Sequence, residues 1–228
     1  MESKWISRGE CPCGESSRGY NIHADGHAFC FSCNKRFNNI GEAKMESKVI
    51  NIQENTSVSG EYKAIPDRRI SERTAKKYKT KIKTNGSIVS HHYYEYFNAD
   101  SSHVATKIRQ VEGKKIWSQG DIGDALLFGQ NLFKSGGKYI TITEGEIDAM
   151  STYEMLGSKW AVVSIKNGVQ SAVQNCKQHL RYLNSFENVV ICFDNDKPGI
   201  EASQKVARLF EPNKCKIVNL EYKDPNEY

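Results

Sequence analysis

The stretch ITITEGEIDAM, residues 140–150, sets a short apolar run directly against a cluster of acids. Glu144, Glu146 and Asp148 lie within five residues of one another, so their carboxylates repel at neutral pH. The apolar run predicts a strand, and IDAMSTYEML predicts a helix that ends at Gly157. The acids therefore lie where a strand passes into a helix, and a positive charge is needed there to offset their repulsion.

The strand-then-helix order repeats along the C-terminal part of the chain. WAVVSI, NVVICF and CKIVNL are further apolar runs typical of buried strands. A helical spacing of apolar residues from Val169 to Leu183 follows the first run, and IEASQKVARLF follows the second. Strands that alternate with helices predict an α/β fold with right-handed crossovers and a mostly parallel sheet flanked by helices. Ligand sites in such sheets lie beyond the carboxyl ends of the strands.

A second acid pair follows another predicted strand. NVVICFDNDKPG places Asp194 and Asp196 two residues apart, so in an extended chain both side chains point the same way. In a parallel sheet Glu144 leaves from the same edge, and Asp148 follows on the first helical turn. We expect these four carboxylates to line one cavity, where hard oxygen ligands suit Mg²⁺ or Mn²⁺. Two such ions can stabilise the entering and leaving oxygens of an in-line attack at phosphorus.

Several of these acids also have a simpler interpretation. Asp196, which precedes Lys197 and Pro198, can act only as the N-cap of the next helix. Glu146 and Asp148 can merely favour a helix N-terminus, by about 0.3–1 kcal/mol each. Glu146 has the weaker claim to the cavity: either it contacts a second metal ion or it only favours the start of the helix.

Composition sets the general class of the chain. With 228 residues and 38% hydrophobic content, it is long enough for one large domain or for a small and a medium one. No apolar run approaches the ~20 residues of a membrane span, and MESKWISRGE lacks the apolar core of a secretory signal. Residues 61–118 hold 13 Lys and Arg against 6 Asp and Glu, which favours a polyanion partner; a solvated basic face is the alternative.

The basic stretch predicts a sheet of its own. IPDRRISERTAKKY is expected to contain a short helix with Ser71 as its N-cap. SIVSHHYYEYF, HVATKIRQV and KKIWSQ are rich in Val, Ile, Tyr and Thr and are separated by NAD and EGK turns. They therefore predict an antiparallel meander. His91 and His92 are expected to be residues of the sheet surface rather than catalysts.

Four of the seven cysteines cluster near the N-terminus. In a reducing cytoplasm, which the lack of a signal favours, two thiol pairs sixteen residues apart predict a tetrahedral zinc site. About 40 residues bury too little apolar surface to fold alone, and zinc supplies roughly 10–16 kcal/mol. The first pair is C-x-C instead of the usual C-x-x-C, and His23 and His27 are nearby substitutes. The predicted zinc ligands are Cys11, Cys13, Cys30 and Cys33.

Together these motifs resemble a known family. TEGEID and FDND on alternating strands are similar to the Toprim domain, which bacterial-type primases, type IA and type II topoisomerases, some nucleases and a recombination mediator share. With the cysteine ribbon, the chain resembles the primase half of the primase–helicases of short-tailed phages. The resemblance runs in order from about residue 5 to 227 and includes DGHAFCFSC, KIR (107–109), DALLFG (124–129), VVSIKNG (162–168) and KDPNE (223–227).

The resemblance implies a DNA primase that makes short RNA primers on single-stranded DNA from nucleoside triphosphates, by metal-dependent nucleotidyl transfer. It implies catalytic acids at Glu144, Asp148, Asp194 and Asp196, with Mg²⁺ or Mn²⁺ held by Glu144, Asp194, Asp196 and Asp224. Nucleotide contacts are implied for Lys107, Arg109, Lys114 and Lys115. Contacts with the DNA template are implied for Asp25, His27, Arg68 and Arg69.

Composition and resemblance together divide the chain into four parts. Residues 1–40 are expected to form a zinc-ribbon domain that recognises the template, and residues 41–61 a flexible linker. Residues 62–137 would be the basic N-terminal part of an RNA polymerase domain, and residues 138–228 its Toprim subdomain. The expected partners are single-stranded DNA, nucleoside triphosphates, a replicative helicase and a DNA polymerase, with no membrane, in the cytoplasm of the infected host cell.

Two departures from the family pattern stand out besides the short thiol pair. Asn226 replaces the second acid of a pair found in bacterial primases, and no G-x-x-x-x-G-K-[ST] loop for an ATP-driven helicase occurs in the sequence. Two alternatives stay open. A non-catalytic recombination mediator has more closely spaced cysteines and an incomplete acid set, and a Toprim nuclease needs no cysteine ribbon. A topoisomerase would need a nucleophilic tyrosine on a further large domain.

Overall fold

The structure is a computed structural model that describes residues 5–9, 20–23, 27–30, 35–37 and 59–228. The chain divides into two compact units, residues 1–51 and residues 52–228. Within the described ranges, no helix has both the length and the apolar character that a bilayer crossing requires.

The first unit contains a small antiparallel sheet in which the strands follow chain order. Ala28 and Cys30, on its third strand, have no exposed surface. Of the predicted zinc ligands only Cys30 falls in the described part of the chain, since Cys11, Cys13 and Cys33 lie outside it, as does Asp25. The zinc ribbon therefore stays a prediction. The strands are β1 (Trp5–Gly9), β2 (Tyr20–His23), β3 (Ala28–Cys30) and β4 (Lys35–Phe37).

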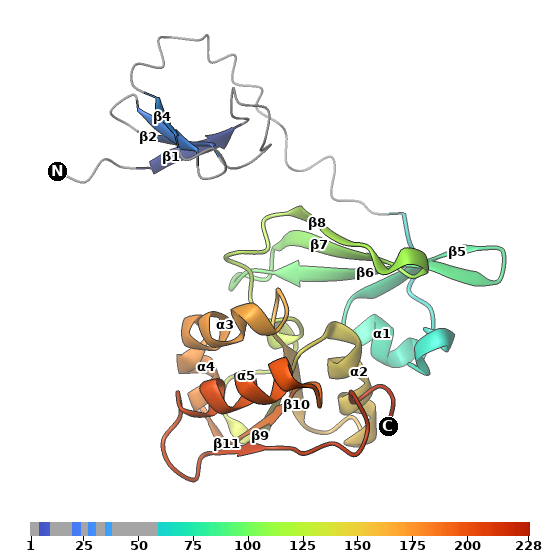
Figure 1. Ribbon diagram of the computed structural model, residues 1–228. Coiled ribbons are helices and arrows are strands. Elements are labelled where there is room, and N and C mark those ends of the chain that lie inside the picture. The colour runs from blue at the N-terminus through green and yellow to red at the C-terminus, as the bar shows by residue number, and fades with distance from the viewer. Residues whose placement is uncertain (1–4, 10–19, 24–26, 31–34, 38–58) are drawn as a thin grey trace. The chain divides into compact units, whose positions relative to one another are not determined.

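The second unit begins with a short helix and an antiparallel sheet, which Figure 1 shows in cyan and green. Ser71 is the N-cap of the helix, because its hydroxyl accepts from the Thr74 amide at 3.3 Å, as predicted. The sheet has one more strand than the three that were predicted. The elements are η1 (Pro66–Arg68), α1 (Glu72–Lys77), β5 (Thr80–Asn85), β6 (Ile88–Phe97), β7 (His103–Gln110), η2 (Glu112–Lys114) and β8 (Ile116–Gly120).

Alternation along β6 decides which of its side chains are buried. His92, Tyr94 and Tyr96 are at most 1% exposed on the inner face, where the two tyrosines pack in one core with residues of α2. His91 points to the other face and is only half-buried. The expectation of two surface histidines is therefore right for His91 and wrong for His92, because neighbouring strand residues point to opposite faces.

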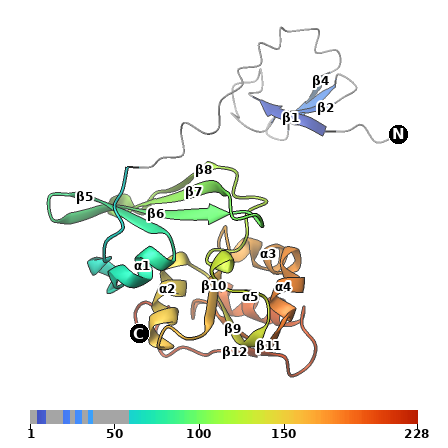
Figure 2. The ribbon, with the colours of Figure 1, turned by 180° about the vertical axis from the view of Figure 1, so that it is seen from behind.

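The C-terminal part forms a four-stranded parallel sheet in the order β10-β9-β11-β12, which confirms the predicted α/β fold. Helix α2 packs on one face, in the core that it shares with the antiparallel sheet, and α3, α4 and α5 pack on the other (Figures 1 and 2). The elements are η3 (Gln130–Leu132), β9 (Gly137–Thr143), α2 (Glu146–Met155), β10 (Ala161–Ser164), η4 (Val169–Ser171), α3 (Ala172–Gln178), α4 (Leu180–Asn184), β11 (Phe186–Cys192), α5 (Lys197–Ala207) and β12 (Cys215–Ile217).

The apolar spacing from Val169 to Leu183 is not one helix. His179 has a backbone φ of −107° and separates α3 from α4, and a 3-10 turn precedes them both. The side chains of Ala172, Cys176 and Leu183 nevertheless have no exposed surface. The apolar pattern therefore marks the buried side of the segment but does not show where its backbone bends.

Two contacts join segments next to the antiparallel sheet to strand β10 of the parallel sheet. The Tyr78 hydroxyl donates to the Val162 carbonyl at 3.0 Å, and Phe128 forms a β-bridge with Ser164 through two backbone bonds of 3.1 Å. Gly129 follows that bridge with a φ of +80°, and a β-carbon there would lie 2.7 Å from the Tyr78 ring and 3.1 Å from the Val162 carbonyl oxygen. The close approach of these segments depends on a residue without a side chain.

We predict that Gly129→Ala lowers the free energy of unfolding by about 3 kcal/mol, because it combines an unfavourable left-handed backbone with overpacking. Gly157→Ala is the matched control: its φ is +67° but nothing lies within 4 Å of the added carbon. It should cost only about 1 kcal/mol. Urea unfolding of both variants measures the difference, and equal losses would show that the packing around position 129 is looser than described.

Candidate metal-binding edge

The acids meet at one edge of the parallel sheet because of strand register. Strands β9 and β11 are neighbours, and Cys192 pairs with Thr143, so both strands end at the same level. Glu144 follows β9 directly, and Asp194 lies two residues beyond β11. The backbone of Asp194 donates toward the Glu144 carboxylate. The structure thus brings together the two acids that the sequence predicts at neighbouring strand ends.

Glu144 lies in a partly desolvated position with like charges nearby. Burial raises the pKa of its carboxyl to about 7, and the negative charges of Asp194 and Asp196 add to that rise. Its Oε2 atom is buried and has no hydrogen-bond partner. An acid in this condition gains more from a bound cation than an exposed acid does, since less water competes for it.

Asp194 has the same combination of burial and repulsion. Burial is the main cause that raises the pKa of Asp194 to about 6, and the negative charges of Asp224 and Asp196 raise it further. The positive charge of Lys223 lowers it. Its Oδ1 atom is also buried without a partner. A β-carbon on Gly199 would lie 2.2 Å from the Asp194 carbonyl oxygen, so the start of α5 can pack against this turn only with glycine there.

Asp148 extends the cluster from the first turn of α2. Burial raises its pKa to about 7, with the charges of Asp194, Asp224, Glu146 and Glu144 as further causes. A β-carbon on Gly145 would meet Asp148 Oδ2 at 2.5 Å. The glycine of the TEGEID motif therefore leaves room for the carboxylate of the acid three residues later.

The two remaining predicted acids have partners within the chain. Asp196 is exposed, and its Oδ1 accepts from the Gly199 amide at 2.9 Å, so it is the N-cap of α5. This is the simpler interpretation of that residue, although its charge still acts on Glu144. Asp224 Oδ1 accepts from the amides of Asn226 and Glu227 at 3.0 Å each. Both side chains retain a second oxygen for a ligand.

Glu146 belongs to a buried ion pair. Its Oε1 atom accepts from Lys107 Nζ and from the Tyr96 hydroxyl, and all three residues are at most 9% exposed. Lys107 also donates to the Lys166 carbonyl. The sequence suggested a metal contact or a helix start for Glu146, and the internal lysine was missed. Lys107, the predicted nucleotide ligand, has its ammonium group directed at this acid.

Lys166 is a further residue whose structural role sequence reasoning missed. It is 1% exposed, and burial lowers the pKa of its amine. Its Nζ donates to the carbonyls of Gly123 and Ala125 at 2.6 and 2.7 Å and to Gln178 Oε1 at 3.1 Å. It thereby fixes the loop before β9 to the end of β10. A lysine that directly follows an apolar run, in VVSIK, is the signal that could have identified it.

Asn226, in the C-terminal turn, ties three segments together. Its Nδ2 donates to the Arg68 carbonyl and to the Ser151 hydroxyl, both at 2.8 Å, and Arg68 Nη1 lies 3.5 Å from its Oδ1. An aspartate could not donate these bonds. Asn226 therefore couples the C-terminal turn, which carries Asp224, to η1 and α2.

The predicted basic residues divide into two groups. Arg109 and Arg68 lie near the inner face of the antiparallel sheet, where both act on His92, whose pKa burial lowers to about 4. Arg69, Lys114 and Lys115 are exposed. His27, predicted to read the template, stacks on His23 with ring centroids 4.3 Å apart.

The donor chemistry of this edge fits a hard divalent cation. Two orphaned carboxylate oxygens, on Glu144 and Asp194, are the kind of ligand that Mg²⁺ and Mn²⁺ prefer. As the side chains stand, no three His, Cys, Asp or Glu residues among those described converge on one point that could hold a metal ion.

Three comparisons with known proteins agree on the same relationship. Residues 141–228 match the family described as Toprim-like. A DNA helicase/primase of Enterobacteria phage T3 is 31% identical over 94% of this chain. The chain spans 39% of the length of that relative.

Solved structures extend the comparison to the whole chain. The primase fragment of the bacteriophage T7 primase–helicase protein is 29% identical, with a TM-score of 0.68 over 98% of this chain and 93% of that one. A primase domain of phage T7, solved with the lagging-strand DNA polymerase, is 31% identical, with a TM-score of 0.66 over 74% of this chain and 84% of that one. The chain therefore belongs to the family formed by the Toprim-containing primase parts of short-tailed-phage primase–helicases.

Proposed function

We propose that this chain is a DNA primase that joins nucleoside triphosphates into short RNA primers on a single-stranded DNA template. The observation that carries the proposal is the pair of orphaned, buried carboxylate oxygens on Glu144 and Asp194 at neighbouring strand ends. Family membership supplies the reaction class. The T3 relative is a DNA helicase/primase, and the T7 primase domain was solved bound to an RNA/DNA hybrid and dTTP.

In this proposal the acid edge holds one or two divalent cations. Glu144, Asp194 and Asp148 are the principal ligands, and Asp196 and Asp224 contribute the oxygens that their turns leave available. A bound Mg²⁺ or Mn²⁺ would lower the pKa of the primer 3′-hydroxyl and neutralise charge on the α-phosphate of the incoming nucleotide. The 3′-oxygen would bond to that phosphorus as the bond to the bridging oxygen breaks, so that pyrophosphate leaves, while the acids hold the ion in place.

The basic residues would bind phosphate groups of the triphosphate and of the template. Arg109 and Arg68 lie near the inner face of the antiparallel sheet, and charge-assisted bonds from guanidinium groups are suited to phosphate oxygens. Exposed Lys114, Lys115 and Arg69 are proposed to contact the triphosphate or the template backbone. Lys107 would act chiefly by holding Glu146, because its ammonium group is already engaged there.

The N-terminal unit is proposed to recognise the template. A zinc ion on Cys11, Cys13, Cys30 and Cys33 would stabilise it, and Asp25 and His27 would read bases. Cys30 fits such a site in being buried on a strand. We retain residues 1–40 as this domain and 41–61 as its linker, with 62–137 and 138–228 as the two parts of the polymerase domain.

Partners are proposed by analogy with the relatives. The T3 protein combines helicase and primase, and the T7 primase domains were solved with a DNA polymerase. We therefore propose that the primers made here pass to a DNA polymerase and that a helicase supplies the unwound template, within the cytoplasm of the infected cell.

Glu144→Gln and Asp194→Asn should each lower primer synthesis by about 100-fold or more, because each removes charge that stabilises the transition state. Labelled nucleoside triphosphates, Mg²⁺ and a pool of random single-stranded templates provide the assay, with extension of a dinucleotide as a second readout. Glu201→Gln, an exposed acid on α5, is the matched control and should keep full activity. If the wild-type chain cut the template and made no RNA, the nuclease alternative would replace this proposal.

Protein without Mg²⁺ or Mn²⁺ should lose stability as pH rises from about 4 to 7. The pKa of Asp148 is raised from the usual value of 3.8 to about 7 in the folded chain. Below pH 3.8 the carboxyl is neutral in both the folded and the unfolded chain, so it does not affect stability. Above pH 7 it is ionised in both, and the folded chain bears the full cost of the buried charge. Asp148→Asn removes the charge, and we expect it to stabilise the zinc-loaded chain at pH 8 without Mg²⁺ or Mn²⁺ by about 2–4 kcal/mol, but not at pH 4.

Chemical unfolding at both pH values measures this difference, with Glu201→Gln again as the control. Mg²⁺ should stabilise the wild type at pH 8 more than it stabilises Asp148→Asn. A loss of stability in Asp148→Asn that is the same at pH 4 and pH 8 would mean that this carboxylate is stabilised by partners within the chain.

A further inference from the structure

The outer face of the antiparallel sheet, opposite the acid edge, carries aromatic and basic side chains in rows. Strand register places Lys81, Tyr93, Ile108 and Trp117 in one row across β5, β6, β7 and β8, and places Lys83, His91 and Gln110 in the next. The labelled α-helices lie on the other side of this sheet in both views (Figures 1 and 2).

Three of the rings on this face lie next to one another. His91 stacks on Tyr93 with centroids 6.0 Å apart and planes 9° from parallel, and it meets Trp117 edge-on at 6.0 Å. Trp117 is 42% exposed, whereas Ile108 beside it is 2% exposed and Tyr93 is 6% exposed. The indole therefore lies on a firmly packed base and keeps one part open to a ligand.

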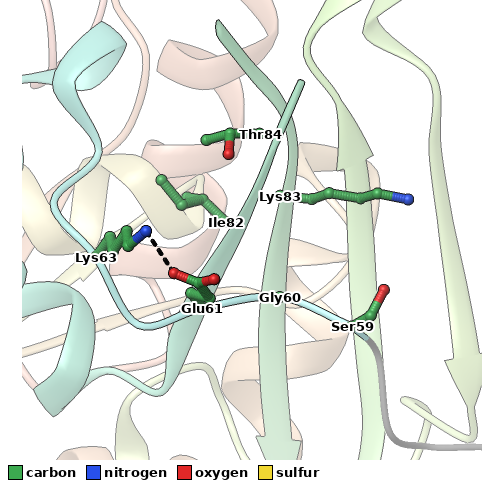
Figure 3. Close-up of a pocket in the computed structure, with 7 residues that line it drawn as sticks. All are labelled: Ser59, Gly60, Glu61, Lys63, Ile82, Lys83 and Thr84. Carbon is green, nitrogen blue, oxygen red and sulfur yellow. Dashed lines mark ion pairs between the residues drawn. The ribbon is translucent and has the colours of Figure 1, made fainter. Parts of the chain in front are cut away.

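Positive charge flanks the rings along β5. Lys79 and Lys81 place their Nζ atoms 5.8 and 4.9 Å from the ring centre of Tyr62. Lys83 is exposed and points away from Ile82, as Figure 3 shows. The carboxylate of this face, Glu95, already binds Lys81 at 2.7 Å and accepts from the Tyr62 hydroxyl at 3.1 Å.

The outer edge of β5, where Ile82 bridges Glu61, carries one internal ion pair and one lysine that is unpaired within the described part of the chain. A hollow of about 370 Å³ lies between Ser59–Lys63 and β5, and within it Lys63 pairs with Glu61 at 2.5 Å (Figure 3). Lys79 and Lys83 have no such carboxylate partner among the described residues. The net charge that the outer face offers a ligand is therefore positive.

We propose that this surface, which we call the aromatic face and define by Lys79, Lys81, Lys83, His91, Tyr93 and Trp117, binds single-stranded nucleic acid. Bases stack on Trp117 and His91, and phosphates contact Lys79 and Lys83. Rings interleaved with lysines are the recurring solution for binding single strands without sequence preference, because every base has a π-face. We favour single-stranded nucleic acid over a protein as the ligand, because the face combines stacked rings with uncompensated positive charge.

This binding goes beyond the proposed function, because it needs neither a metal ion nor a triphosphate. Lys107 and Arg109 alternate with Ile108 along β7 and therefore point to the inner face, toward the acids. The aromatic face points the other way. It offers a second contact for the template, or for product that has left the acid edge, outside the site of synthesis.

The test measures binding of a fluorescein-labelled oligothymidylate of about 20 nucleotides to the zinc-loaded full chain without Mg²⁺ or Mn²⁺, by fluorescence anisotropy at several salt concentrations. Trp117→Ala should weaken binding by about 5- to 100-fold through lost stacking. Trp117→Phe should keep most of the affinity and lose the quenching of tryptophan fluorescence that stacking causes. Lys83→Gln should reduce the slope of log K against log salt by about 0.7, the value for one phosphate contact on a single strand.

Matched controls lie elsewhere on the chain. Tyr228→Ala removes an exposed aromatic side chain and Lys216→Gln an exposed lysine, both outside the antiparallel sheet. Both variants should leave the affinity unchanged. Glu201→Gln, an exposed acid on α5, should also bind as the wild type does. The proposal is overturned if folded Trp117→Ala and Lys83→Gln bind within twofold of wild type with unchanged slopes. Tighter binding by Trp117→Ala, as expected if another part of the chain or a protein covers the face, overturns it equally.

Discussion

The repulsion between carboxylates that strand register holds at one sheet edge is the constraint on which the rest of this structure depends. Glu144 and Asp194 follow the paired ends of β9 and β11, and partial burial removes some of the water that would screen them. The chain leaves one oxygen of each without a hydrogen bond. A group that is buried, charged and unpaired is costly. The orphaned oxygens of the two acids are therefore suited to a bound cation, and Lys223 only partly offsets the charge around Asp194.

Glu146 shows the opposite outcome at a distance of two residues. Its carboxylate is paired within the chain with Lys107 and accepts a hydrogen bond from Tyr96, and Lys107 also donates to the Lys166 carbonyl. Removing one partner of a buried ion pair typically costs about 3–5 kcal/mol, because the other charge is left uncompensated. The pair thus fixes the antiparallel sheet against the end of the parallel sheet. Glu146 thus has its cation, Lys107, within the chain, whereas an external cation is proposed for the neighbouring Glu144.

Local patterns in the sequence predicted the fold class, the strand ends and the acids on them. Those features depend on residues close together in the chain, such as Glu144 after an apolar run. The pairing of Lys107 with Glu146 and the contacts of Lys166 with the loop at Gly123 join distant segments, and no local spacing indicates them. Strand β5 was missed because its exposed lysines alternate with only two buried residues, Thr80 and Ile82, which is too short a pattern to recognise.

Direct measurement of Mn²⁺ binding tests the central claim, that the acids of this edge form a cation site. Electron paramagnetic resonance can follow the titration of zinc-loaded protein at neutral pH, with Mg²⁺ added as a competitor. The account predicts Mn²⁺ binding by the wild type that Mg²⁺ displaces, and affinity weakened by about tenfold or more in Glu144→Gln and in Asp194→Asn. Equal Mn²⁺ affinity in the wild type and in both variants would contradict it.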